Sequence, residues 1–456
     1  MTDAASVILS IVLITVLHFT IRLPRVSLVP KGIDAMYHLL CASKFQRGRP
    51  PRTLGKFVVG DEYTHPPLLH ILLSLFNERF RAKALFLIGL VSDYVLSLVV
   101  YFVALQFVPV PFALTAALIY CITPASFISS VSESARPLGS LWYGLTILLL
   151  STQNLFWMIC AIVTTALTLM SHKMATQTLL FTCLLMSPIL FTVNPLFPLP
   201  LILGLSLALL ATRGSYLDIL GDHIGIIRFH MKYGSWNRRR KLPGSPVQLV
   251  KMQPYFFLPL FGLLLNPEVF LSRPIFLLAW YASVLIVFFA WVWGDADRYL
   301  SYSAMPVAFL SAIALSIGTN LIFLVPPIIV SSALIYRNSQ VFYKRENLPD
   351  FSKIETTEES VTLVVPSSLT YISALNMKGR ILCGGSNATG LRFELETFPK
   401  LMSTNPYRLL AEYPVSHLLL GPKHHDFVKS VEANFEPVQA TNGYMLFKRK
   451  KITENS

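Results

Sequence analysis

The chain has 456 residues, of which 54% are hydrophobic and 14% are charged, and its formal net charge is +14. Because a soluble domain usually carries about 25% charged residues, this composition excludes an ordinary soluble protein. The repeated long apolar segments predict a polytopic membrane protein. The positive charge is concentrated: residues 22–56 carry eight Lys and Arg against one acid, and residues 213–251 carry eight against two. Such localised charge favours anionic headgroups or phosphates as partners and does not favour nucleic acid.

Eleven apolar segments are candidate membrane-spanning helices. The first, at about residues 4–21, lacks the basic start and the small-residue cleavage site of a signal peptide, so we expect it to be retained. The other ten lie at about 84–107, 110–128, 138–152, 154–170, 175–191, 196–211, 254–267, 274–293, 300–316 and 318–336. Several are shorter than the roughly 20 residues that a spanning helix needs, which leaves their number and boundaries open.

A polar loop, residues 22–83, separates the first two apolar segments. Asp34 is its only acid before Gly60. If the segment from Ala35 to Phe45 is helical, His38 lies one turn after Asp34. A second helix should open at Pro66-Pro67, since proline is tolerated in a first turn. At about 11 residues this helix is too short to span a bilayer, which places it in the membrane interface.

The composition changes at about Lys344, where charges return and apolar segments shorten to strand length. The segments 361–365, 381–383 and 417–420 are typical of buried strands, and residues 426–434 have helical spacing. Thr441-Asn442-Gly443 predicts a hairpin turn between 435–440 and 444–449. The fold class is therefore a membrane all-α bundle of about 11 helices, residues 1–343, with a small C-terminal α/β domain, residues 344–456.

Two short sequence motifs carry a resemblance to a known family. The first is Gly32-Ile-Asp34-Ala-Met-Tyr37-His38, followed in the same loop by Tyr63-Thr-His65-Pro66-Pro67-Leu68. The second is Asp297-Arg298-Tyr299-Leu300 with Pro306, late in the apolar region. With the layout of the whole chain, they resemble the GT-C superfamily of integral-membrane glycosyltransferases, which includes protein O-mannosyltransferases and lipid A aminoarabinose transferases.

The resemblance implies a membrane enzyme that transfers a sugar from a polyprenyl-phosphate donor to a glycan, lipid or protein acceptor. Asp34 would be the general base for the acceptor hydroxyl. Arg298 would bind the donor phosphate, since a guanidinium suits bidentate phosphate contacts. The other candidate substrate-binding residues are His38, Tyr63, His65, Lys173 and Tyr299.

The pattern departs from the family at one position. Many relatives have a second acid directly after the first, but here Ala35 follows Asp34. Asp61 and Glu62, near the end of the loop, are the alternative source of a carboxylate. Whether Asp34, Asp61 and Glu62 hold a divalent metal is therefore left open, and the cofactor stays unknown.

Most of these candidates have a plain structural explanation as well. Asp34 suits the N-cap of the helix that follows it, and the Tyr63–Pro67 segment suits a rigid turn into the next helix. His172 and Lys173, at the end of a span, suit side chains that reach toward the interface. Glu133 and Arg136, also between two spans, suit a local ion pair. Cys41 and Cys383 could pair only on one oxidising side, and the Asn387-Ala-Thr389 glycosylation sequon is a triplet that arises often by chance.

The orientation follows from the number of spans. Eleven spans place loop 22–83, residues 129–137, His172-Lys173, loop 212–253, the turn 295–298 and the C-terminal domain on one face. The positive-inside rule would make that face cytoplasmic. The family layout makes it non-cytoplasmic, because the same charges serve a polyprenyl-phosphate site, and we expect the latter, in the plasma membrane.

Two other functions are weighed against glycosyl transfer. A transporter or lipid flippase would fit the many helices, but we expect no charged residue at the middle of a span and find no pair of similar halves. A membrane scaffold that displays the C-terminal domain would leave the polar residues of one face unexplained.

Overall fold

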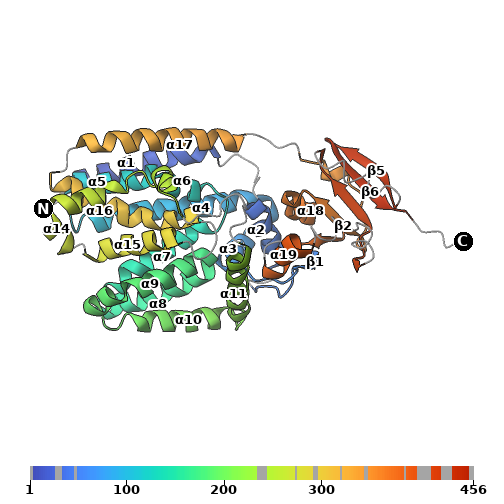
Figure 1. Ribbon diagram of the computed structural model, residues 1–456, viewed down its shortest axis with the longest axis horizontal. Helices are drawn as coiled ribbons and strands as arrows, with labels where there is room; N and C mark the ends of the chain where they lie inside the picture. Colours follow the sequence, from blue (N-terminus) through green and yellow to red (C-terminus); the bar gives the residue numbers. More distant parts are fainter. Residues whose placement is uncertain are drawn as a thin grey trace, which may run out of the picture.

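The computed structural model describes residues 4–25, 33–45, 49–233, 244–272, 275–290, 296–318, 321–343, 348–384, 387–397, 412–422 and 434–450. A bundle of helices forms one end of the molecule and a smaller α/β unit forms the other (Figure 1). Two short helices and one helix that turns across the bundle lie where the two parts meet.

Every one of the eleven predicted spans contains a helix. They are α1 (Ala4–Arg22), α4 (Glu78–Ala104), α5 (Val110–Ile122) with α6 (Pro124–Ser130), α7 (Arg136–Leu150), α8 (Leu155–Ser171), α9 (Lys173–Val193), α10 (Pro198–Ala211), α13 (Phe257–Leu265) before α14 (Pro267–Leu271), α15 (Ile275–Ala290), α16 (Ala304–Ser316) and α17 (Val325–Tyr343), which the 3₁₀ turn η3 (Leu321–Leu324) precedes.

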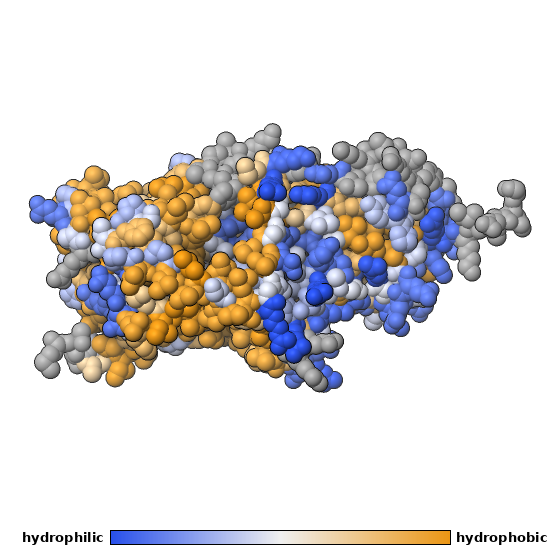
Figure 2. Space-filling view, turned by 90° about the horizontal axis from the view of Figure 1, so that it is seen from below, coloured by the Kyte–Doolittle hydropathy of each residue, from blue (hydrophilic) through white to orange (hydrophobic). Residues whose placement is uncertain are grey.

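The bundle is that of an integral membrane protein. Within the described ranges, four helices are long and apolar enough to cross a membrane, and up to seven if each of three bent pairs counts as one span. On the face that Figure 2 shows, hydrophobic residues predominate over the helical end, while hydrophilic residues gather over the α/β end. A count of eleven crossings does not follow from length and composition.

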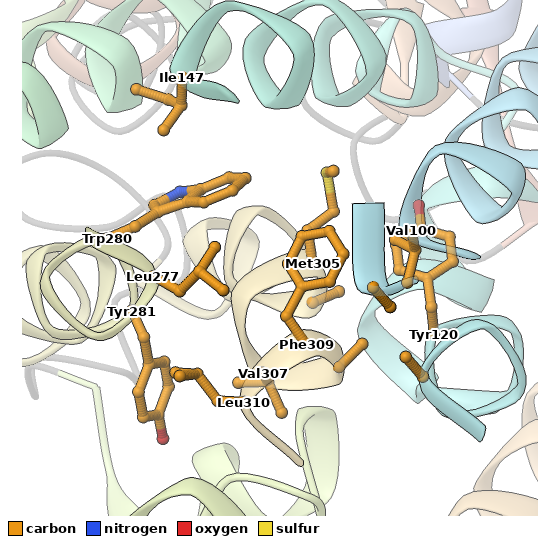
Figure 3. Packing of buried hydrophobic residues seen from close by; sticks show 14 of the residues in the cluster. Val100, Tyr120, Ile147, Leu277, Trp280, Tyr281, Met305, Val307, Phe309 and Leu310 are labelled. Atoms are coloured by element: carbon orange, nitrogen blue, oxygen red, sulfur yellow. The ribbon is translucent and has the colours of Figure 1, made fainter. Parts of the chain in front are cut away.

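Helix α16 lies at the centre of the bundle. All of its residues from Ala304 to Leu315 are buried. Its alanines allow close approach of neighbouring helices, and its larger side chains, such as Met305 and Phe309, pack among Val100, Tyr120 and Trp280 (Figure 3). The resulting core fixes the ends of α4, α7, α9 and α15, on which polar residues stand.

A buried ion pair corrects the expectation that no span carries a charge at its middle. Asp93 lies inside α4, 3% exposed, and its Oδ2 is 2.9 Å from Nη2 of Arg22, which is 0% exposed at the end of α1. Tyr120 and Ser126 donate to the other carboxylate oxygen at 2.7 and 3.1 Å. In the sequence, Asp93 is flanked by apolar residues and shows no partner. The partner is Arg22, from the basic segment at residues 22–56. The pair is held by side chains of neighbouring helices, so it gives no support to transport.

Four further helices line the polar end of the bundle. They are α2 (Ile33–Lys44), α3 (Leu68–Ser74), α11 (Tyr216–Tyr233) and α12 (Pro246–Met252), the last begun by a capping box of Ser245 and Gln248. The segment near 35–45 is helical, and the helix expected after Pro67 is confirmed. Helix α11 turns by 113° from the axis of α10 (Figure 1), so it lies across the end of the bundle.

The α/β unit is built on a six-stranded sheet. The strand order is β1-β3-β2-β4-β6-β5, from β1 (Phe57–Val59), β2 (Val361–Val365), β3 (Arg380–Cys383), β4 (His417–Leu420), β5 (Phe435–Thr441) and β6 (Tyr444–Arg449). The strands β1 to β4 pair in parallel, and β6 pairs antiparallel with β4 and β5. The predicted strands and the hairpin are confirmed. Asn442 and Gly443 have φ of 48° and 80°, as a primed two-residue turn requires. The helix expected at 426–434 falls almost wholly outside the described residues.

The sequence pattern does not predict one strand of the sheet, β1. Strand β1 comes from loop 22–83 and pairs with β3, more than 300 residues later in the chain. The central strands are hydrophobic on both faces because both are covered, as in parallel sheets generally. Side chains of α2 and of α18 (Thr370–Asn376) form the cover on one face. The first loop and the C-terminal segment therefore share one core.

Candidate active site

Helix α2 places Asp34 at the junction of the bundle and the α/β unit. Asp34 is the second residue of the helix, so it lies within the first turn, where a carboxylate interacts favourably with the helix dipole. Its side chain is 58% exposed, and Oδ2 lies 3.8 Å from Nη2 of Arg136. Arg136 is the first residue of α7, a position where the dipole disfavours a cation. Arg136 pairs across the site with the Asp34 carboxylate, and this negative charge offsets the unfavourable interaction with the helix dipole.

A chain of hydrogen bonds runs inward from α2. His38 Nδ1 lies 2.8 Å from Nε2 of His70, and His70 Nδ1 lies 2.6 Å from the hydroxyl of Tyr63. Burial lowers the pKa of His38 to about 4, although the nearby Asp34 carboxylate raises it and Arg136 lowers it further. Burial also lowers the pKa of His70 well below its usual range. Both imidazoles are therefore neutral at pH 7, and each acts as donor at one nitrogen and acceptor at the other.

His172, between α8 and α9, lies within the electrostatic influence of two cations of the site. Shielding from water is the main cause that lowers the pKa of its imidazole, and the charges of Arg136 and Arg298 lower it further. Its Nδ1 lies 3.3 Å from the hydroxyl of Tyr302. Arg136, paired with Asp34, and Arg298 therefore both act on one neutral imidazole. Asp34, through its ion pair with Arg136, and Arg298 both belong to the electrostatic surroundings of His172.

Two buried nitrogens near this cluster have no hydrogen-bond partner among the described residues. They are Nδ1 of His65 and Nε2 of His223. The ring of Tyr37 lies 4.6 Å from that of His65 and holds it against α2. A buried polar atom without a partner costs about 1–3 kcal/mol. Such atoms fit a site in which hydroxyl groups of a ligand complete the hydrogen bonds.

Lys173 makes a different contact from the one expected of it. Its Nζ donates to Oδ2 of Asp222 on α11 at 2.5 Å. The same oxygen accepts from the hydroxyl of Thr64 at 2.9 Å, and Oδ1 accepts from the amide of Ala388 at 2.8 Å. Asp222 thus joins the bundle, the first loop and the α/β unit. Lys173 is positioned next to His65 but is already paired.

Arg298 and Tyr299 lie on η2 (Ala296–Ser303), the 3₁₀ turn that leads into α16. The side chain of Tyr299 is 2% exposed, and its hydroxyl donates to Oε1 of Gln177 at 2.8 Å. Arg298, the preceding residue, is exposed. The buried tyrosine anchors the turn to α9, and this anchor fixes the position from which the arginine extends.

Asp61 and Glu62 are committed to structural contacts. The carboxylate of Asp61 accepts backbone amides of Gly55, Lys56 and Phe57 at 2.8–3.0 Å, which closes the turn before β1. Glu62 accepts from the side-chain amide of Asn387 at 3.1 Å. No group of three or more His, Cys, Asp or Glu suited to a metal occurs within the described ranges. The arrangement does not fit a metal held by Asp34, Asp61 and Glu62.

The sequon asparagine and the cysteines also have definite places. Asn387 is 3% exposed and caps α19 (Ala388–Arg392) by accepting the amide of Gly390 at 2.8 Å. All five cysteines, including Cys41 and Cys383, are free thiols.

Two residues of the site have no signal of their own in the sequence. His70 lies within an apolar segment, and Asp222 lies in a basic loop window. Half of the ten histidines, however, fall in or near this cluster: His38, His65, His70, His172 and His223. An excess of histidines in segments expected at one face of a membrane is the signal that would have indicated His70, and Asp222 has no comparable signal.

Comparison with known proteins gives matches among solved structures alone, since no family model and no curated protein sequence matches. ArnT from Cupriavidus metallidurans, solved with undecaprenyl phosphate, superimposes with a TM-score of 0.61 at 12% identity over 99% of this chain and 99% of that chain. The Archaeoglobus fulgidus oligosaccharyltransferase superimposes with a TM-score of 0.59 at 13% identity over 98% of this chain and 74% of that chain. The chain has the GT-C fold. The predicted resemblance is thereby confirmed at the level of the fold, through both the helical bundle and the α/β unit.

The GT-C fold gives the described cluster a context. The oligosaccharyltransferase has also been solved tethered to an acceptor peptide with an NVT sequon, with a TM-score of 0.60 at 14% identity over 97% of this chain. A further structure of it contains zinc and sulfate. At these identities the roles of single residues do not transfer, so the chemistry must be argued from the geometry above.

Proposed function

We propose that this protein is an inverting membrane glycosyltransferase that moves a sugar from a polyprenyl-phosphate donor to an acceptor hydroxyl. The observation that supports it best is the grouping of one accessible carboxylate, Asp34, with two cations, Arg136 and Arg298, around the neutral imidazole of His172. Similar folds bind such lipids: ArnT is solved with undecaprenyl phosphate and the archaeal oligosaccharyltransferase with dolichol-phosphate. The acceptor is a glycan, a lipid or a protein.

In the proposed step, Asp34 takes the proton of the acceptor hydroxyl as its oxygen attacks the anomeric carbon. The new carbon–oxygen bond forms on the face opposite the phosphate, and the bond from the sugar to the phosphate oxygen breaks. The leaving group is the polyprenyl phosphate, whose added charge Arg298 and Arg136 stabilise. Because Asp34 is 58% exposed, it can then release the proton to water.

Neutral histidines would bind the uncharged parts of the substrates. The unpartnered nitrogens of His65 and His223 suit hydroxyl groups of the sugar or the acceptor, since a neutral imidazole both donates and accepts. The chain from His38 through His70 to Tyr63 fixes the orientation of α2, and with it the direction of Asp34. Lys173 and Tyr299 would act as positioning residues through Asp222 and Gln177.

The proposal includes a topology. It has about eleven membrane crossings, a bundle at 1–343 and an α/β domain at 344–456, with β1 added to its sheet from the first loop. The site and the α/β domain would face the non-cytoplasmic side of the plasma membrane. The convergence of loop 22–83, Arg136, His172 and Asp222 at one end of the bundle supports this arrangement.

The test uses purified full-length protein with radiolabelled polyprenyl-phosphate sugars and a membrane extract as acceptor. Asp34→Asn should abolish transfer and leave donor binding intact, because it keeps the shape but removes the basic oxygen. A general base contributes about 10²–10⁴-fold in rate. Arg298→Ala should weaken donor binding, since it removes a phosphate contact.

Asp218→Asn is the matched control, because Asp218 is an exposed carboxylate of α11 outside the site. It should transfer sugar at the wild-type rate. Transfer by Asp34→Asn at that rate would show that Asp34 is a structural residue only, and the mechanism would have to be abandoned.

A further inference from the structure

A cavity of about 230 Å³ lies between α11 and the α/β unit. Arg228, Phe229 and Lys232 of α11 line one side, and Arg392 of α19 and Glu396 of the following π-helical turn (Phe393–Thr397) line the other. None of these residues belongs to the site described above. The lining carries three cations and one carboxylate, so it is strongly positive for its size.

The positive charge of this cavity is only partly compensated. Glu396 Oε1 lies 3.4 Å from Nζ of Lys232, which pairs one cation with the one acid. Arg228 and Arg392 are both exposed and make no hydrogen bond or ion pair with any other described residue. Two guanidinium groups from two different parts of the fold therefore line one cavity with their donors available.

The chemistry of the lining selects an anion of limited size. Guanidinium groups bind phosphate and carboxylate through pairs of parallel hydrogen bonds. Phe229, 2% exposed, forms an apolar wall beside them. The volume is below the range of about 300–1,000 Å³ that is typical of pockets for drug-sized ligands. It therefore suits a single charged headgroup and not an extended oligosaccharide.

Helix α11 carries an exposed apolar stripe beside this cavity. Leu217, Ile224 and Met231 recur every seventh residue on its outward side and are 60%, 51% and 69% exposed. An exposed apolar stripe flanked by basic residues is typical of helices that lie in the membrane interface. Phosphate groups of lipids gather at that depth, and soluble phosphorylated molecules also reach it.

We infer that the cavity between α11 and α19 is an anion-binding site, separate from the reaction centre, that takes one phosphate-bearing group of headgroup size. Arg228 and Arg392 bind the phosphate from opposite sides, and the bound group joins α11 to the α/β unit. The inference does not depend on the proposed glycosyl transfer, because none of its residues takes part in that reaction.

The test separates the two sources of phosphate. Full-length protein in detergent is titrated with phosphatidylglycerol, and with phosphatidylcholine as the neutral lipid. Native mass spectrometry measures how much of each lipid stays bound to the protein. Soluble glycerol 1-phosphate is titrated separately by calorimetry. Arg228→Gln/Arg392→Gln should weaken binding by about tenfold or more, since a hydrogen bond to a charged group contributes about 1.5–3 kcal/mol. Arg79→Gln/Lys251→Gln is the control, because it removes the same charge from exposed positions on α4 and α12.

Retention of phosphatidylglycerol alone, lost in the arginine pair variant, would identify a lipid headgroup. Binding of glycerol 1-phosphate, lost in the same variant, would identify a soluble ligand. Arg228→Lys keeps the charge and should weaken binding less, which covers the case in which the double variant does not fold. If neither probe binds, or if the wild type and the double variant bind equally, the cavity is only a gap between two packed elements and the inference is overturned.

Discussion

The ion pair between Arg22 and Asp93 gives a quantitative prediction about the bundle. One oxygen of the Asp93 carboxylate accepts hydrogen bonds from Tyr120 at 2.7 Å and Ser126 at 3.1 Å, and the other lies 2.9 Å from the Arg22 guanidinium in an ion pair. Both charged side chains are almost fully buried. Removing one partner of a buried pair leaves the other charge uncompensated, at a cost of about 3–5 kcal/mol. Replacing both with apolar residues removes both charges. Asp93→Leu should therefore lower stability more than Arg22→Met/Asp93→Leu does.

The measurement is the temperature at which half of the purified protein stays monodisperse in detergent. This temperature reports relative kinetic stability, so the ranking of variants is the result that matters. Asp218→Asn removes an exposed carboxylate and should leave the temperature unchanged. If the double variant is less stable than Asp93→Leu, the pair contributes net stability beyond charge compensation. The argument that each charge serves mainly to neutralise the other would then be refuted.

Two further predictions concern the junction of the bundle and the α/β unit. His38 has a folded-state pKa of about 4, so between its ordinary value of 6.5 and that value the unfolded chain binds a proton that the folded chain does not. The contribution of His38 to stability should be constant above about pH 6.5 and fall as the pH drops toward 4, by up to about 3 kcal/mol. Thermal unfolding against pH should show a slope in this range, and His38→Gln should make the slope shallower without removing it, because His70 and His172 also have lowered pKa values. Asn387 is buried and bonded to Glu62 and Gly390, so expression in a glycosylating host should leave the intact mass of the protein free of a glycan at this sequon.

Local features of the sequence were enough to predict most elements. Apolar segments of spanning length, strand-length segments after residue 344 and the Asn442-Gly443 turn all appear where periodicity and turn chemistry indicated them. The helix that begins beside Asp34 and the helix after Pro67 are also correct. These features depend on neighbouring residues, which is why the sequence reveals them.

Contacts between distant parts of the chain could not be predicted in this way. Asp93 shows no partner in its own segment, since Arg22 is 71 positions earlier. Strand β1 has three residues, too few for a pattern, and exists because β3 provides its pairing edge. The sequence does not reveal that Lys173 is paired with Asp222 on another helix. Tertiary partners decide such cases, and local propensity does not.

The pairing of β1 with β3 has a consequence for how the protein is made. Phe57 aligns with Ile381, so the loop that carries Thr64, His65 and His70 obtains its supporting strand only after almost the whole chain has been synthesised. At about 5–20 residues per second, the interval is roughly 15–65 s. Contacts of such long sequence separation also form slowly because loop closure precedes them. The nascent bundle would therefore wait in the membrane with an incomplete junction, and premature termination before β3 would yield an inserted but inactive protein.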